Sequence, residues 1–156
     1  MWQRIQTVFL ALVVVSMVAS IFLPIWVFQD PATGVKHELY PLHYTVKEQD
    51  QRTTLYFPYS ITAILMVAAA TIAVMEIRRF DNRITQIKMG TLNSLVLMGV
   101  MIAAVVFSNK LAGQFNYGWR YGLTLWTAFA GVAFNWLALR FIRKDEKLVR
   151  DSDRLR

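Results

Sequence analysis

The sequence predicts an all-α membrane protein: an antiparallel bundle of four transmembrane helices with a small β-containing extracytoplasmic loop and a cytoplasmic C-terminal helix. Hydrophobic residues make up 56% of the chain and gather in four long apolar segments. One bundle of this kind uses up all 156 residues, so 1–156 is expected to form a single domain. A strongly basic stretch follows the last apolar segment and marks the cytoplasmic end.

The first apolar segment covers about residues 7–27 and ends near Pro24 and Trp26, which suits an aromatic residue at the outer membrane interface. Residues 18–20 resemble a signal-peptide cleavage site, but the apolar run continues through Phe22 and beyond. We therefore expect a retained helix rather than a cleaved signal peptide.

The outer loop, residues 28–57, begins with a turn signal at 30–34. Long loops without structure of their own are uncommon, so we expect this one to be partly ordered on the helix ends. A small hairpin or meander is expected from three β-prone pieces, at about 35–40, 44–47 and 53–57.

Three further spans are expected at about 58–77, 89–107 and 119–140, joined by a cytoplasmic turn and by a short outer turn at 108–118. These spans contain small residues that would allow close approach of neighbouring helices. Among them, Gly118 stands four positions before Gly122 at the outer end of the last span. We interpret these small residues as helix packing within the bundle, with oligomerisation as the alternative.

The net charge of +7 is distributed unevenly relative to the spans. Most of the 17 Lys and Arg residues lie at the chain ends and in the middle loop, and the remainder lie on the opposite side at Lys36, Lys47, Arg52, Lys110 and Arg120. The positive-inside rule therefore places both termini and the middle loop in the cytoplasm.

Polar residues recur near the cytoplasmic helix ends. Because a helix rises about 1.5 Å per residue, Asn93 and Asn135 lie at matching depth, which predicts a hydrogen bond between them worth about 0.6 to 2 kcal/mol. Glu76 and Arg140 are expected to form an ion pair, with Arg4 crowding the first span. This polar belt either fixes helix register, binds lipid head groups, or forms part of a proton or ion path.

The cytoplasmic tail, residues 141–156, predicts a helix that continues the last span with a narrow apolar stripe. An amphipathic extension lying on anionic lipid and a docking helix for a protein partner are the two main interpretations. Acidic residues interrupt the basic run, which disfavours nucleic-acid binding. The docking residues are Phe141, Arg143, Lys144, Lys147, Leu148, Arg150, Arg154 and Leu155.

The sequence gives no positive sign of catalysis. The chain has no Cys, no Ser/His/Asp constellation and no Gly-rich phosphate loop. His37 and His43 share the outer loop with Asp30 and Glu38, but their spacing matches no metal motif. We expect no enzyme activity, no metal, no cofactor and no small-molecule substrate.

Three stretches carry a resemblance to a known family. Residues 1–10, the inner-loop stretch 83–93, and above all the C-terminal run Arg-Lys-Asp-Glu-Lys-Leu-Val-Arg with the final Asp-Arg-Leu-Arg resemble the domain-of-unknown-function family 4293. That family comprises small four-span membrane proteins of Bacteroidota. Trp2, Leu139 and Asp151 depart from its pattern. The resemblance implies an inner-membrane protein and directs attention to the two chain ends.

These observations favour a non-catalytic accessory or assembly subunit of a larger inner-membrane complex, with membrane lipids around it. It would dock through the bundle face and the basic C-terminal helix. A small transporter or lipid-handling protein that uses the polar belt is the alternative.

Overall fold

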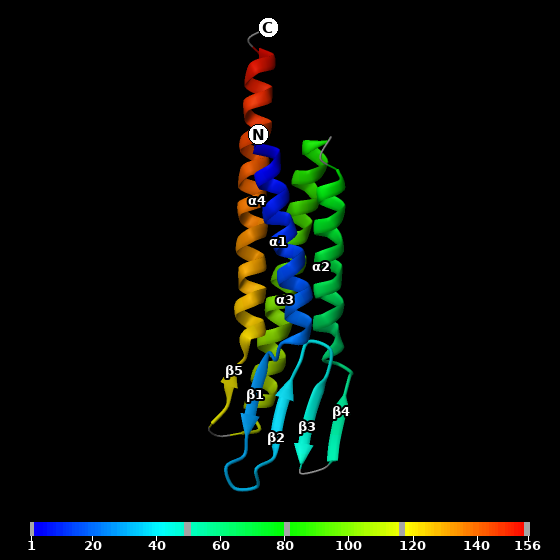
Figure 1. The fold of residues 1–156 in the computed structure, drawn as a ribbon, viewed down its shortest axis with the longest axis vertical. Helices are drawn as coiled ribbons and strands as arrows, with labels where there is room; N and C mark the ends of the chain where they lie inside the picture. The colour runs from blue at the N-terminus through cyan, green and yellow to red at the C-terminus, as the bar shows by residue number, and fades with distance from the viewer. Residues whose placement is uncertain (1, 49–50, 80–81, 116–117, 155–156) are drawn as a thin grey trace.

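The computed structural model describes residues 2–48, 51–79, 82–115 and 118–154, with side chains between residues 5 and 151 of these ranges. Four helices dominate the fold (Figure 1). They are α1 (Trp2–Phe22), α2 (Ser60–Arg78), α3 (Arg83–Ala112) and α4 (Leu123–Arg154). The predicted mostly helical fold with a small β-containing loop is confirmed, and the helix that continues the last span reaches Arg154.

The helices alternate in direction and form a ring in which α1 packs against α2 and α4, and α3 closes the ring between them. The start of α1, the turn between α2 and α3, and the protruding part of α4 lie at one end, here called the tail end (Figure 1). A five-stranded sheet lies at the other, here called the sheet end.

Apolar residues cover both the inside and the outside of the helices. The inner core repeats at helical spacing, as in Val13 and Met17 of α1 and Met66, Ala69 and Ala73 of α2, all fully buried. The outward faces carry exposed side chains as apolar as those inside, including Val15, Ile64, Leu95 and Phe129. All four helices are long and apolar enough to cross a membrane.

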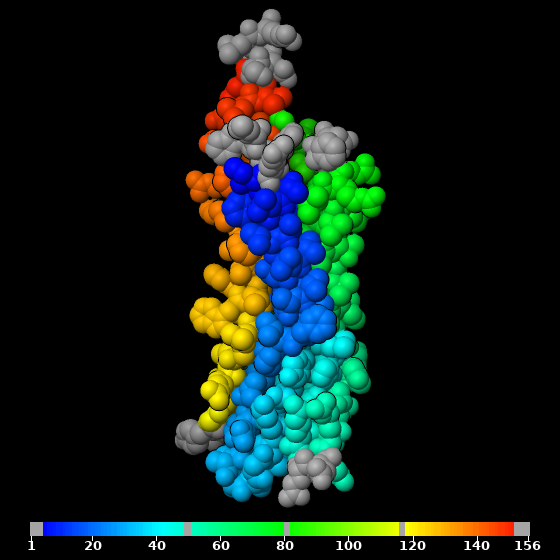
Figure 2. All heavy atoms as spheres, in the orientation of Figure 1, coloured from blue at the N-terminus to red at the C-terminus, as the bar shows by residue number. Residues whose placement is uncertain are grey.

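The antiparallel sheet caps the bundle in the strand order β4-β3-β2-β1-β5. Its strands are β1 (Trp26–Gln29), β2 (Lys36–Leu39), β3 (Tyr44–Glu48), β4 (Gln51–Leu55) and β5 (Arg120–Tyr121). Figure 2 shows strands and helices as one elongated body. The three predicted β-prone pieces of the outer loop are confirmed as β2, β3 and β4.

Helix α3 supports this sheet because it is longer than a bilayer requires. Its 30 residues span about 45 Å, whereas the hydrocarbon core is about 30 Å thick. Its last turns therefore pack Leu111 and Ala112 against Trp26, Phe28 and Leu39 of the sheet. The expected outer turn from 108 is partly wrong, since residues 108–112 are helical and form the floor of the sheet.

Two expected span boundaries also differ in the structure. Helix α1 ends at Phe22, and Trp26 is a fully buried strand residue rather than an interface anchor. Helix α4 begins at Leu123 because residues 120–121 pair with β1. The expected packing of Gly118 and Gly122 within a helix is wrong. Gly118 has a φ of +88°, and a Cβ at Gly122 would overlap the Pro24 carbonyl oxygen.

Candidate functional site

Buried polar side chains gather inside the tail end of the bundle. Asn93 of α3 and Asn135 of α4 are almost fully buried, and the Asn93 Nδ2 donates to the Asn135 Oδ1 at 3.3 Å, which confirms the predicted hydrogen bond. The Asn135 Nδ2 donates to the Gly90 carbonyl at 3.1 Å and to the Ser94 Oγ at 2.8 Å. Asn135 thus satisfies its amide group entirely through α3 and fixes the register of the two helices.

Glu76 of α2 is fully buried, and neither of its carboxylate oxygens has a hydrogen-bond partner among the residues that the structure describes. The carboxyl group lies beside Gly90, where a Cβ would come within 2.8 Å of its Oε1. Gln86 Nε2 donates at 3.0 Å to the Glu76 backbone carbonyl and so closes the α2–α3 turn. Glu76 therefore has a buried carboxyl group that the described side chains of this cluster leave without a hydrogen bond.

The predicted ion pair between Glu76 and Arg140 is wrong. Arg140 is exposed, and its guanidinium lies over the Trp136 ring at 5.5 Å from the ring centroid. Successive helix residues are rotated by about 100°, so Leu139 occupies the inward position and Arg140 faces outward. The two residues share a level in the bundle but face different directions.

Two further members of this cluster, Gln86 and Ser94 of α3, were not predicted. Gln6 of α1 is also buried, with its Nε2 unpartnered among the described residues. The spacing of seven residues between Gln86 and Asn93 is a signal that could have identified Gln86 from the sequence. Arg4 belongs to α1, but its side chain lies outside the described residues.

A groove of about 410 Å³ opens on the outside of the same end, between α3 and α4. It adjoins the buried cluster, because Ser94 contributes to both. Both basic residues in it belong to α4. Its lining residues are Thr91, Ser94, Trp136, Leu139, Arg140 and Arg143.

The structure divides the predicted docking tail into an anchored part and an exposed part. Phe141 stacks on Phe9 of α1 with the ring centroids 5.6 Å apart, so it is packed within the bundle. Asp145 pairs with Arg83 of α3 at 3.2 Å. Beyond it, Leu148 is 54% exposed. Lys144, Lys147 and Arg150 are exposed as well, whereas the side chains of Arg154 and Leu155 lie outside the described residues.

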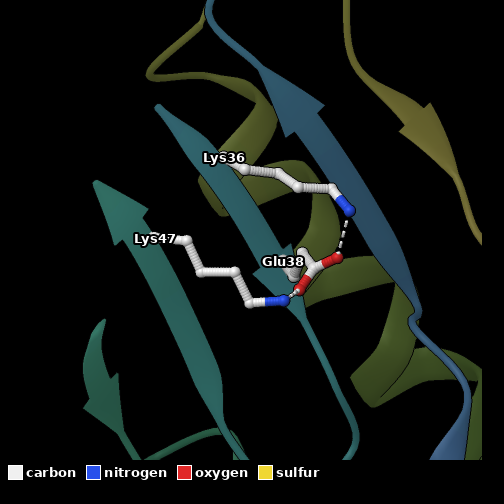
Figure 3. Close-up of polar contacts among 3 residues, drawn as sticks. All are labelled: Lys36, Glu38 and Lys47. Carbon is white, nitrogen blue, oxygen red and sulfur yellow. Dashed lines mark hydrogen bonds and ion pairs between the residues drawn. The ribbon is translucent and has the colours of Figure 1, made fainter. Parts of the chain in front are cut away.

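The sheet end carries a separate charged group. Glu38 of β2 is nearly buried and contacts Lys36 at 2.7 Å and Lys47 of β3 at 2.6 Å (Figure 3). Burial alone would raise the pKa of Glu38, but the two lysines outweigh it and hold that pKa below the usual carboxyl range. This arrangement ties β2 to β3 and leaves the carboxylate fully satisfied.

The two loop histidines are packed rather than gathered around a common point. His37 Nδ1 lies 2.6 Å from the Tyr44 hydroxyl, and His43 stacks on Tyr40. Burial lowers the pKa of both histidines. Across the described ranges, His, Asp and Glu side chains form no group of three that would hold a metal ion.

Four membrane-length apolar helices, arranged around a buried polar cluster, define this chain as a multi-pass membrane protein. The sequence matches the family model described as "Domain of unknown function (DUF4293)" over residues 2–155. The match covers nearly the whole chain, and the protein belongs to this family. No curated protein matches it.

Proposed function

We propose that this DUF4293 protein is a non-catalytic accessory or assembly subunit of a larger inner-membrane complex. The observation that carries the proposal is the shape of α4, which continues as one helix of 32 residues and projects past the other three (Figure 1). Its length is about 48 Å, well beyond the hydrocarbon thickness of a bilayer. A projecting rigid helix suits binding to a partner better than it suits any reaction of the bundle itself.

The docking segment is residues 146–154, the part of α4 beyond the Arg83–Asp145 ion pair. That pair fixes the direction in which the segment leaves the bundle. Leu148, at 54% exposed, is the apolar side chain that a partner would cover. Covering the exposed half of this side chain contributes about 1 kcal/mol to binding, which corresponds to roughly fivefold in affinity.

The proposed orientation places the tail end in the cytoplasm, with both termini there. The supporting observation is that the basic residues of the α2–α3 turn and of the end of α4 all belong to the tail end. Lysine and arginine near span ends are retained on the cytoplasmic side of the inner membrane. In this orientation the docking segment would contact a cytoplasmic surface of its partner.

A tagged pull-down from native membranes in mild detergent, read by mass spectrometry, tests the proposal. We expect full-length protein to recover one stoichiometric complex. A version that stops after Lys147 keeps the Arg83–Asp145 pair and is expected to lose that complex. The point variant Leu148→Ala is expected to reduce recovery several-fold.

The matched control is Leu95→Ala, because Leu95 is 62% exposed on the membrane-facing side of α3. Its recovery should equal that of the full-length protein. All variants are compared for thermal stability in the same detergent, so that loss of the fold is separated from loss of docking. Recovery of the bundle alone by every version would overturn the proposal.

A further inference from the structure

The groove between α3 and α4 at the tail end has the composition of a lipid head-group site. Trp136, Arg140 and Arg143 line it from successive turns of α4, at spacings of four and three residues that place them on one helix face. Leu139 is 7% exposed and forms its apolar floor. The groove therefore offers cations at one level and an aromatic and an aliphatic surface below them.

Among the residues that the structure describes, no carboxylate forms an ion pair with either arginine of the groove. The nearby Asp145 is bound to Arg83, and Glu76 lies on the inside of the bundle beside Gly90. A guanidinium presents five donors in a planar fork that matches a phosphate group.

The position of Arg140 is informative about depth. Its guanidinium stacks on Trp136, one turn earlier in α4, and so points toward the membrane-spanning part of the helix. Tryptophan is favoured at the head-group level of a membrane interface. At that level an arginine would be within reach of lipid phosphates, unlike the exposed basic residues at the end of the tail.

The hydroxyl groups of the groove have a different role. Thr91 Oγ1 donates to the Ile87 carbonyl at 2.8 Å, and Ser94 Oγ donates to the Gly90 carbonyl at 3.0 Å. Both hydroxyl protons are thus used, and the Ser94 oxygen also accepts from Asn135 Nδ2 at 2.8 Å. The exposed Thr91 oxygen remains an acceptor, which suits a head group that carries its own hydroxyl donors.

We propose that this groove binds an anionic phospholipid, with the phosphate between Arg140 and Arg143 and the first part of an acyl chain along Trp136 and Leu139. Phosphatidylglycerol, which combines one negative charge with hydroxyl donors, is the probe. The site is independent of the proposed docking segment, so either proposal stands if the other fails.

Native mass spectrometry of the purified full-length protein tests this site. The protein is given equal amounts of phosphatidylglycerol and phosphatidylcholine with the same acyl chains. We expect phosphatidylglycerol to be retained preferentially. The double variant Arg140→Gln/Arg143→Gln is expected to weaken its retention at least about tenfold, because the charge-assisted hydrogen bonds to phosphate are lost.

The matched control removes the same charge at the same end of the bundle, outside both the groove and the docking segment, as Arg78→Gln/Arg79→Gln at two exposed arginines. It should stay within about twofold of the unchanged protein if general surface attraction is minor. Equal losses in the two double variants, or equal retention of the two lipids, would overturn the proposal. Displacement of the bound lipid by inorganic phosphate alone would also overturn it, because that result assigns the site to free anions. Thermal stability confirms that both double variants remain folded.

Discussion

Glu38 is a buried carboxylate that two neighbouring lysines stabilise. It is a nearly buried carboxylate on a small exposed sheet, and it is stabilised because lysines from its own strand and from β3 reach both of its oxygens. Each lysine keeps about two fifths of its side chain accessible, so solvent weakens both ion pairs (side-chain exposures of 41% and 36%). The lysines remain partly solvated without Glu38, whereas the buried Glu38 carboxylate needs the lysines to offset its loss of water.

The sheet is therefore expected to lose stability in acid. The pKa of Glu38 is lowered in the folded state, so its contribution is present above the unfolded-state value of about 4.5 and is lost as pH falls through the lower folded-state value. Lys47→Met should cost about 1 kcal/mol at neutral pH, and the cost should shrink toward zero in acid. Thermal unfolding of both proteins in detergent, from neutral pH to below pH 4.5, measures this stability difference.

Arg52→Gln is the control for this experiment, because Arg52 lies opposite Lys47 on β4 and makes none of the ion pairs in the described ranges. It should show no pH-dependent loss. A Lys47→Met penalty that is the same at neutral and acid pH would assign the effect to side-chain packing instead.

At the scale of elements, the close approach of three helices depends on Gly90. A Cβ at this position would lie 2.6 Å from Leu139 Cδ2 and 2.8 Å from Glu76 Oε1. Gly90→Ala is therefore expected to destabilise the bundle by about 1–3 kcal/mol, although alanine favours a helix by up to about 1 kcal/mol. Unfolding in detergent, followed by circular dichroism, measures the change.

Gly99 of the same helix is the matched control, since its added Cβ would meet only Leu65 Cδ1 at an ordinary 3.7 Å. Gly99→Ala should be neutral or stabilising, for the reason of helix propensity alone. Adding Leu139→Ala to Gly90→Ala should recover part of the loss by making room. Equal stability of the two single glycine variants would show that α3 tolerates a side chain at Gly90.

The sequence predicts how far along the bundle a residue lies better than it predicts the direction that its side chain faces. Helical rise is constant, so counting residues correctly paired Asn93 with Asn135. The same counting paired Glu76 with Arg140, which face opposite ways because rotation about α4 is set by packing of Leu139. Glycines at a spacing of four were equally ambiguous, because Gly118 and Gly122 serve a turn and a close backbone approach.

At the scale of the whole molecule, the orientation in the membrane is open to a direct test. The chain contains no Cys, so single cysteines introduced by Arg52→Cys on β4 and Lys147→Cys on α4 are the only labelling sites. With a membrane-impermeant thiol reagent on spheroplasts, we expect Arg52→Cys to react at once and Lys147→Cys only after permeabilisation. The reverse pattern would invert the proposed topology.

The four long helices and most of the sheet were predictable because long apolar runs and β-prone pieces are local signals. Strands β1 and β5 were not predicted. Strand β1 begins within an apolar run that belongs to the expected first span, and β5 is a two-residue strand that pairs with the distant β1. The sequence suggested that Trp26 is a membrane-interface residue, whereas in the fold it is fully buried in the sheet. The exposed turns of α4 beyond Asp145 were predictable from sequence, whereas the anchoring of Phe141 on Phe9 was not.

The pairing of β1 with β5 has a consequence for biosynthesis. Strand β1 leaves the ribosome directly after the first helix, whereas β5 follows only once the third helix has been made. The edge of β1 that pairs with β5 therefore has no partner until the two intervening helices have been synthesised. Closure of this edge joins the first and last helices outside the lipid, so the sheet is completed only in a chain whose membrane integration has reached its final stage.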